Sequence, residues 1–205
     1  MLQAQAKPPS GRRTRRSYRM CVSTNFDRTV RRHLLHRGAK FDIESLEFCG
    51  NSGRSIRREC IRHQGSVILL PLLEDGRIVM IKNWRLSTES WLWELPAGTM
   101  SPGEAPITCA ARELTEETGF VASSLVPLQG LPWFYAAPGL TDERMHAFVA
   151  TGLSPVPQAL EEDERIETHP MPRAHLNQLI ASGEVVDAKT LLVLFAWDRA
   201  FNAAP

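Results

Sequence analysis

The sequence predicts an α/β protein with a small antiparallel β-hairpin ahead of its main body. Two observations carry this prediction: several apolar runs have the length of strands, and an acidic segment near the middle of the chain has the start and stop signals of a helix. With 205 residues, of which 43% are hydrophobic, the chain can bury one ordinary core. We therefore expect a basic, disordered extension over residues 1–39, a β-hairpin domain over 40–63 and the main domain over 64–205.

The extension carries a large part of the positive charge. Residues 1–40 contain eleven Lys or Arg and a single acid, Asp27, whereas residues 41–205 contain thirteen Lys or Arg and twenty-two acids. The first twenty positions have the composition of a disordered segment, and a helix is a candidate around residues 28–37. Three roles stay open: a tail without a specific role, an arm that binds nucleic acid, and an organelle transit peptide. No apolar stretch follows the charges, so a secretory signal is not expected.

A hairpin is expected next. Residues 41–48 alternate apolar and polar side chains, and residues 54–62 form a second strand candidate after a turn at 49–53. Because a lone hairpin is barely stable in water, this one must pack on its own body or on a partner chain.

The main domain begins with an apolar run, residues 65–73 (GSVILLPLL), which predicts a buried strand that turns at 74–76 and returns over 77–84. Further strands are expected at 91–95, 125–128, 145–151 and 166–171, and helices at 172–182 and 188–201. The irregular stretch 133–143 has a length that is often functional.

No apolar run is long enough to span a membrane, and the four cysteines lack metal-ligand spacing. Reduced thiols in a cytoplasmic protein are the simplest account.

The acidic helix is expected over residues 104–118, between a capping-box sequence at 101–104 and Gly119. Three glutamates share one of its faces: Glu113, Glu116 and Glu117. Like charges three and four residues apart repel each other, and a bound cation with a preference for oxygen ligands, such as Mg²⁺, would offset this. Arg112 lies one turn before Glu116 and can orient it by an ion pair. The alternative is an ordinary solvated acidic face.

The opposite face of this helix is apolar. Its members are Ile107, Ala110, Ala111 and Leu114. We expect this face to pack on the sheet.

Residues 98–120 (GTMSPGEAPITCAARELTEETGF) fill every fixed position of the pattern G-x5-E-x7-R-E-U-x-E-E-x-G-U, where U is aliphatic or aromatic. The chain therefore resembles a Nudix hydrolase. Most of the chain after residue 39 is similar to the ADP-ribose pyrophosphatase branch of that family. The matching segments are 62–67, 83–85, 93–98, 137–143 and 184–190. In one of them Asn-Trp-Arg stands where the family commonly has Gln-Tyr-Arg or Gln-Phe-Arg.

The resemblance implies an α/β/α sandwich around a mixed sheet, and an N-terminal hairpin domain that completes the active site of a partner in a homodimer. It also implies magnesium-dependent hydrolysis of ADP-ribose to AMP and ribose 5-phosphate, with Mn²⁺ as a substitute ion. The implied metal ligands are the carbonyl of Ala97 together with Glu113, Glu116, Glu117 and Glu164.

The resemblance also suggests the remaining site residues. Glu162 is the candidate base, in a run of acids (161–164) where the register can slip by one residue and where a solvated turn is the alternative. Glu116 and Arg112 are the other candidate catalytic residues. The candidates for substrate binding are Arg58, Arg85, Glu94 and Pro138. Guanidinium groups pair well with phosphate, but Arg58 has an alternative as an exposed strand residue, Glu94 as a strand end and Pro138 as an ordinary loop proline.

Two other functions compete with ADP-ribose hydrolysis. The same chemistry could act on another nucleoside diphosphate sugar, such as GDP-mannose or UDP-glucose. A second class is an inactive Nudix protein that senses a ligand or regulates through its basic extension. The three intact glutamates and the lack of a recognisable pair of DNA-reading helices argue against the second class, so nucleic acid is not an expected partner.

Overall fold

One buried strand organises the main domain of the protein, whose computed structural model describes residues 30–202. This strand, β4 (Ser66–Pro71), is buried at every position. Successive side chains of a strand point to opposite faces. Val67 and Leu69 accordingly pack in one apolar cluster, and Ile68 and Leu70 pack in another. The buried strand predicted from the apolar run is confirmed.

The sheet around β4 is mixed. Its strand order is β7 (Ala97–Thr99), β4, β10 (Arg144–Pro155) and β8 (Phe120–Pro127), and β9 (Trp133–Tyr135) pairs with β10 as well. Strands β4 and β10 are parallel, whereas the other pairs are antiparallel. A second, antiparallel sheet has the order β11 (Ile166–Met171), β5 (Ile78–Arg85) and β6 (Ser90–Glu94). The expected irregular stretch thus contains one short strand, β9.

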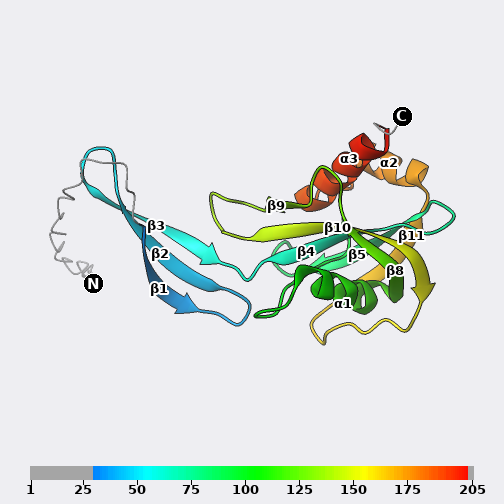
Figure 1. Ribbon diagram of the computed structural model, residues 1–205, viewed down its shortest axis with the longest axis horizontal. Coiled ribbons are helices and arrows are strands. Elements are labelled where there is room, and N and C mark those ends of the chain that lie inside the picture. Colours follow the sequence, from blue (N-terminus) through cyan, green and yellow to red (C-terminus); the bar gives the residue numbers. More distant parts are fainter. Residues whose placement is uncertain (1–29, 203–205) are drawn as a thin grey trace, which may run out of the picture.

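Helices cover both sides of this arrangement (Figure 1). Helix α1 (Pro106–Thr118) packs on one side, whereas α2 (Arg173–Ala181) and α3 (Ala188–Asn202) contribute to the core on the other. The predicted α/β/α sandwich is confirmed. Asp187 accepts a hydrogen bond from the backbone N–H of Thr190 at 3.0 Å and caps α3. Within residues 30–202, no helix has the length and apolar character needed to cross a membrane.

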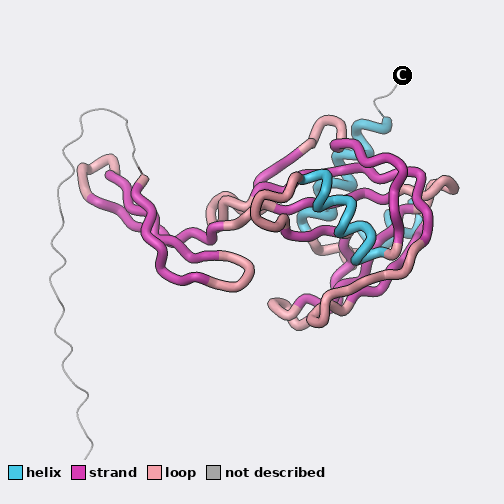
Figure 2. Tube along the Cα trace, turned by 60° about the horizontal axis from the view of Figure 1, so that its bottom comes forward, coloured by secondary structure: helices cyan, strands magenta, loops and turns pink. Residues whose placement is uncertain are grey.

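The N-terminal strands form a separate antiparallel sheet of three strands, β1 (Arg31–Arg37), β2 (Asp42–Cys49) and β3 (Ser55–Arg62). This sheet projects from the main domain as an arm in both views of the chain (Figures 1 and 2). The helix considered for residues 28–37 is wrong over the range of β1. Arginines of β1 face acids of β2, and Arg32 pairs with Glu44 at 2.7 Å. Residues 1–29, which include most of the predicted extension, lie outside the described part.

Helix α1 begins at Pro106, two residues later than predicted. Its N-cap, Ala105, makes no side-chain capping bond. The backbone N–H of Ser101 does donate to the Glu104 carboxylate at 2.8 Å, which is half of a capping box, but this bond closes a turn ahead of the helix. The helix ends at Gly119, which adopts the left-handed conformation (φ 69°) as expected.

The buried face of α1 also differs from the expectation. Ile107 and Ala111 are exposed. Ala110 and Leu114 are buried, as predicted. The full set of buried residues includes two glutamates: Cys109, Ala110, Glu113, Leu114, Glu117 and Thr118. The helix therefore turns acids, and not only apolar side chains, toward the sheet.

Candidate active site

The loop at β7 lies against the acidic helix at Gly98. A Cβ added to Gly98 would lie 1.8–2.2 Å from the carboxylate atoms of Glu113, a separation that real Cβ atoms essentially never show. Next to it, the backbone N–H of Ala97 donates to Oε2 of Glu117 at 2.8 Å. Glycine is therefore required here because the acid occupies the space of a side chain.

The two acids that touch this loop are deeply buried. Glu113 is 6% exposed and Glu117 is 3% exposed. Burial raises the pKa of Glu113 to about 7, against the opposing effect of Arg112. Burial likewise raises the pKa of Glu117 to about 8, against the hydrogen bond from Ala97. The negative charge of these carboxylates is only partly compensated by the groups around them. A bound cation would supply the missing positive charge.

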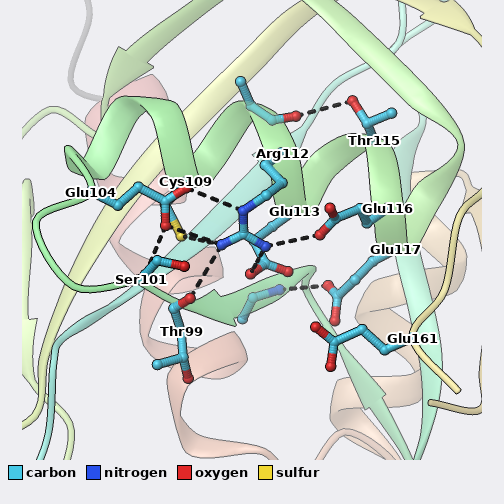
Figure 3. A network of polar contacts seen from close by, with 12 residues as sticks. Thr99, Ser101, Glu104, Cys109, Arg112, Glu113, Thr115, Glu116, Glu117 and Glu161 are labelled. Carbon is cyan, nitrogen blue, oxygen red and sulfur yellow. Dashed lines mark hydrogen bonds and ion pairs between the residues drawn. The ribbon is translucent and has the colours of Figure 1, made fainter. Parts of the chain in front are cut away.

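Arg112 holds the acids of the helix together (Figure 3). Its Nη1 donates to Glu113 and to Glu116, both at 2.8 Å, which confirms the predicted ion pair with Glu116. Its Nε and Nη2 donate to the two oxygens of Glu104 at 3.1 Å, and these bonds lower the pKa of Glu104 to about 2. Nη2 also lies 3.3 Å from Sγ of Cys109, whose pKa burial raises to about 12.

The donors present fit a divalent cation that prefers hard oxygen ligands. Across residues 30–202, no three or more acids, histidines or cysteines surround one point as a complete cage, and Arg112 engages Glu113 and Glu116. Carboxylates on one helix suit an ion that keeps several waters and takes further oxygens from a phosphate. Glu117 and Glu113 would be its buried ligands.

The acidic loop at residues 161–164 approaches the same face. Glu164 raises the pKa of both Glu113 and Glu117 by charge repulsion, so its carboxylate lies within electrostatic reach. Figure 3 shows Glu161 pointing toward Glu117. Glu161 and Glu162 are both exposed. The structure thus brings the predicted loop to the predicted helix.

A cavity of about 410 Å³ lies beside the loop at β7, residues Ala97–Thr99. Its lining comes from β4, β5, β7, β9, β10, the start of α3 and residues next to these elements: Ser66, Arg85, Ala97, Gly98, Thr99, Phe134, Tyr135, Ala136, Glu143, Met145, Asp187, Ala188, Lys189 and Leu192. Among the candidates for substrate binding, Arg85 lines this cavity. Glu94 is 1% exposed and accepts two hydrogen bonds from Arg85, at 2.8 Å and 2.6 Å, so it supports Arg85 from behind.

Two candidates lie apart from this cavity. Arg58 is an exposed residue of β3, where its Nη1 donates to the carbonyl of Arg57 at 2.8 Å. Pro138 is exposed in the loop that follows β9. Neither is among the residues that line the cavity.

Lys189 and Glu143 are charged residues of the cavity that the sequence analysis did not single out. Lys189 reaches Glu94 at 2.7 Å, and Glu143 accepts a hydrogen bond from Ser66 at 2.7 Å. Both occur in segments that carry the family resemblance, 184–190 and 137–143, but no spacing or charge pattern within the sequence marks either residue.

A family model of the NUDIX domain matches residues 62–192. The chain belongs to the Nudix family. It is a Nudix hydrolase, and residues 98–120, which build the site described above, are its Nudix box. Nudix hydrolases generally need divalent metal ions, in agreement with the oxygen donors of this site.

Relatives of this Nudix hydrolase extend the likeness beyond the box. The chain is 35% identical to an ADP-ribose pyrophosphatase of Bacillus subtilis, over 80% of this chain and 88% of the relative. It is 34% identical to an ADP-ribose pyrophosphatase of Mycobacterium tuberculosis, over 78% and 77%. A solved structure of an ADP compounds hydrolase superposes with a TM-score of 0.72 at 25% identity, over 85% of this chain and 94% of the other. The match therefore includes the N-terminal arm as well as the Nudix domain.

A divalent cation is expected to stabilise the protein more at about pH 8.5 than at about pH 6. The pKa of Glu117 is raised from 4.5 to about 8, so its contribution to stability is full below pH 4.5 and is lost as the pH rises through 8. The metal-free protein should accordingly melt at a lower temperature at the higher pH. Melting curves with EDTA or with MgCl2 at both pH values test this, and an equal metal-induced shift at both would contradict it.

Proposed function

We propose that this Nudix hydrolase cleaves the pyrophosphate bond of ADP-ribose and releases AMP and ribose 5-phosphate. The observation that carries the proposal is the pair of buried carboxylates, Glu113 and Glu117, pressed against the glycine loop at the edge of a cavity large enough for part of a nucleotide sugar. The choice of substrate is supported by relatives named ADP-ribose pyrophosphatase that align over most of this chain.

Magnesium is the proposed ion, with manganese as a substitute. The residues that would hold it are Glu113, Glu116, Glu117, Glu164 and the carbonyl of Ala97. When bound, such an ion neutralises the diphosphate oxygens and lowers the pKa of a water molecule. Arg112 fixes the carboxylates of Glu113 and Glu116, so the helix presents them in a defined orientation.

The acidic loop supplies the base that takes a proton from the attacking water. Glu162 is the candidate that the family resemblance suggests, and Glu161, which points toward Glu117, is the alternative in the same loop. Glu164 then remains the ligand candidate, since its charge already acts on both buried acids. Arg85, held by Glu94, is the proposed phosphate contact inside the cavity.

A substrate panel tests this function. Purified protein with MgCl2 should release AMP from ADP-ribose faster than it cleaves GDP-mannose, UDP-glucose, diadenosine polyphosphates or nucleoside triphosphates. Preference for GDP-mannose or UDP-glucose would keep the chemistry and change the substrate, whereas preference for triphosphates would overturn the nucleotide-sugar proposal. Absence of turnover on all of them would favour an inactive sensor.

We also propose a homodimer in which the N-terminal arm of each chain packs on its partner. The arm exposes large apolar side chains, including Leu34 (49%), Leu35 (57%) and Phe41 (45%), although it projects from its own body. A partner would cover this surface and could bring Arg58 to a second active site. Light scattering should give twice the chain mass, and a fully active monomer would contradict the proposal.

The proposed location is the cytoplasm. Cys60 and Cys109 carry free thiols, as expected for a protein in a reducing compartment.

A further inference from the structure

Two cationic side chains share one buried acid at the back of the cavity. Glu94 accepts hydrogen bonds from Arg85 on both oxygens, and its Oε2 also accepts one from Nζ of Lys189 at 2.7 Å. Lys189 lies 2.9 Å from Oδ1 of Asp187 as well. The other oxygen of Asp187 caps Thr190, so both acids that hold Lys189 are themselves fixed.

Arg85 and Lys189 present hydrogen-bond donors to a ligand, in a cavity that Asp187 and Glu143 also line. Arg85 and Lys189 line the cavity, whereas Glu94 does not and is 1% exposed. A guanidinium has five N–H groups and an ammonium has three. Two donors of Arg85 and two of Lys189 are engaged by the acids behind them, which leaves donors on both residues for a ligand.

We propose that Lys189 is a phosphate-binding residue of this cavity, acting together with Arg85, and that Glu94 is the positioning residue for both. The inference deepens the proposed function, because the phosphoryl group would belong to ADP-ribose. The cavity borders the loop at β7, Ala97–Thr99, which contacts Glu113 and Glu117. A phosphoryl group bound by Lys189 and Arg85 would therefore lie next to the proposed metal ligands. Arginine can bind phosphate oxygens in pairs, and lysine adds a compact charge.

A purely structural role is the competing explanation. Lys189 would then only neutralise Glu94, since a buried acid that loses one partner destabilises the fold. Two variants separate the alternatives. Lys189→Met removes the ammonium, and the double variant Lys189→Met/Glu94→Gln also removes the charge that the ammonium balanced.

Calorimetric titration of the metal-free protein with inorganic phosphate, AMP and ribose 5-phosphate tests the proposal without turnover. Lys189→Met should weaken binding of inorganic phosphate roughly tenfold. Whichever of AMP and ribose 5-phosphate also binds more weakly to Lys189→Met carries the phosphoryl group that contacts Lys189. The loss should persist in the double variant. Unchanged binding in Lys189→Met, or recovery in the double variant, would overturn direct contact.

The matched control is Lys82→Met. Lys82 is a half-buried lysine that lies over the ring of Trp93 at 5.4 Å and is not among the cavity residues, so its loss should leave phosphate binding unchanged.

A separate measurement addresses Glu94. Glu94→Gln should raise KM for ADP-ribose and leave kcat nearly unchanged, because binding is lost equally in ground and transition states. A change in melting temperature alone would reduce Glu94 to a structural residue.

The outcomes for the two proposals are distinguishable. A wild-type protein that fails to hydrolyse ADP-ribose would reject the proposed function, while the titrations would still decide whether Lys189 binds phosphate.

Discussion

Glu117→Gln is expected to lower kcat for ADP-ribose about a thousandfold while the protein keeps its fold, because loss of a metal ligand removes several kcal/mol of transition-state stabilisation. The amide retains an oxygen that can accept the hydrogen bond from Ala97, so the loop should stay in place. Burial already favours the neutral form of Glu117, and the variant is neutral at every pH. The melting temperature of the metal-free variant at about pH 8 should therefore equal or exceed that of the wild type.

Steady-state kinetics with a magnesium titration check this expectation. Glu74→Gln is the matched control, because it makes the same change in an exposed turn between β4 and β5. Turnover near the wild-type level in Glu117→Gln would remove Glu117 from the metal site.

Gly98→Ala is expected to reduce activity at least a hundredfold through displacement of Glu113 from the site, since misplacement of a site group by about 1 Å can cost that factor. The added methyl would overlap the Glu113 carboxylate at 1.8–2.2 Å, so either that side chain or the loop must move. We expect a higher magnesium concentration for half-maximal activity as well as a lower kcat.

Gly76→Ala provides the contrast. Gly76 has φ of 80° and no atom within 4 Å of an added Cβ, so alanine there strains the backbone without a clash. It should cost about 1 kcal/mol of folding free energy and leave kcat intact. Equal kinetic losses in the two variants would mean that general destabilisation, and not the position of Glu113, explains the effect at Gly98.

Local signals predicted the centre of the fold. The apolar run at β4 and the pattern around α1 are marked by residues close in sequence, so both elements were predicted, although the start of α1 was placed two residues too early. Strand β1 was missed because its sequence is basic and exposed, with every residue facing solvent to a large extent. Its stability comes from pairing with the acids of β2, a partner that the segment itself does not reveal.

The candidate site shows the same contrast between local sequence signals and contacts that are distant in sequence. Helical spacing alone predicted that Arg112 would pair with Glu116, four residues away. The cavity depends on pairs that are distant in sequence: Lys189 and Glu94 are 95 residues apart, and Glu143 and Ser66 are 77 apart. No periodicity links such positions, so only the folded chain brings them together. The start of α1 was misplaced because Ala105, which precedes Pro106, is extended, so the helix begins at Pro106 and the bond between Ser101 and Glu104 lies ahead of it.

The sulfur atom beside Arg112 has a chemical consequence. Cys109 has no exposed surface, and its pKa of about 12 leaves almost none of it ionised under physiological conditions. Oxidants and alkylating agents attack the ionised form of an accessible cysteine. This thiol lies on α1, and we expect its burial and raised pKa to make it unreactive toward such reagents.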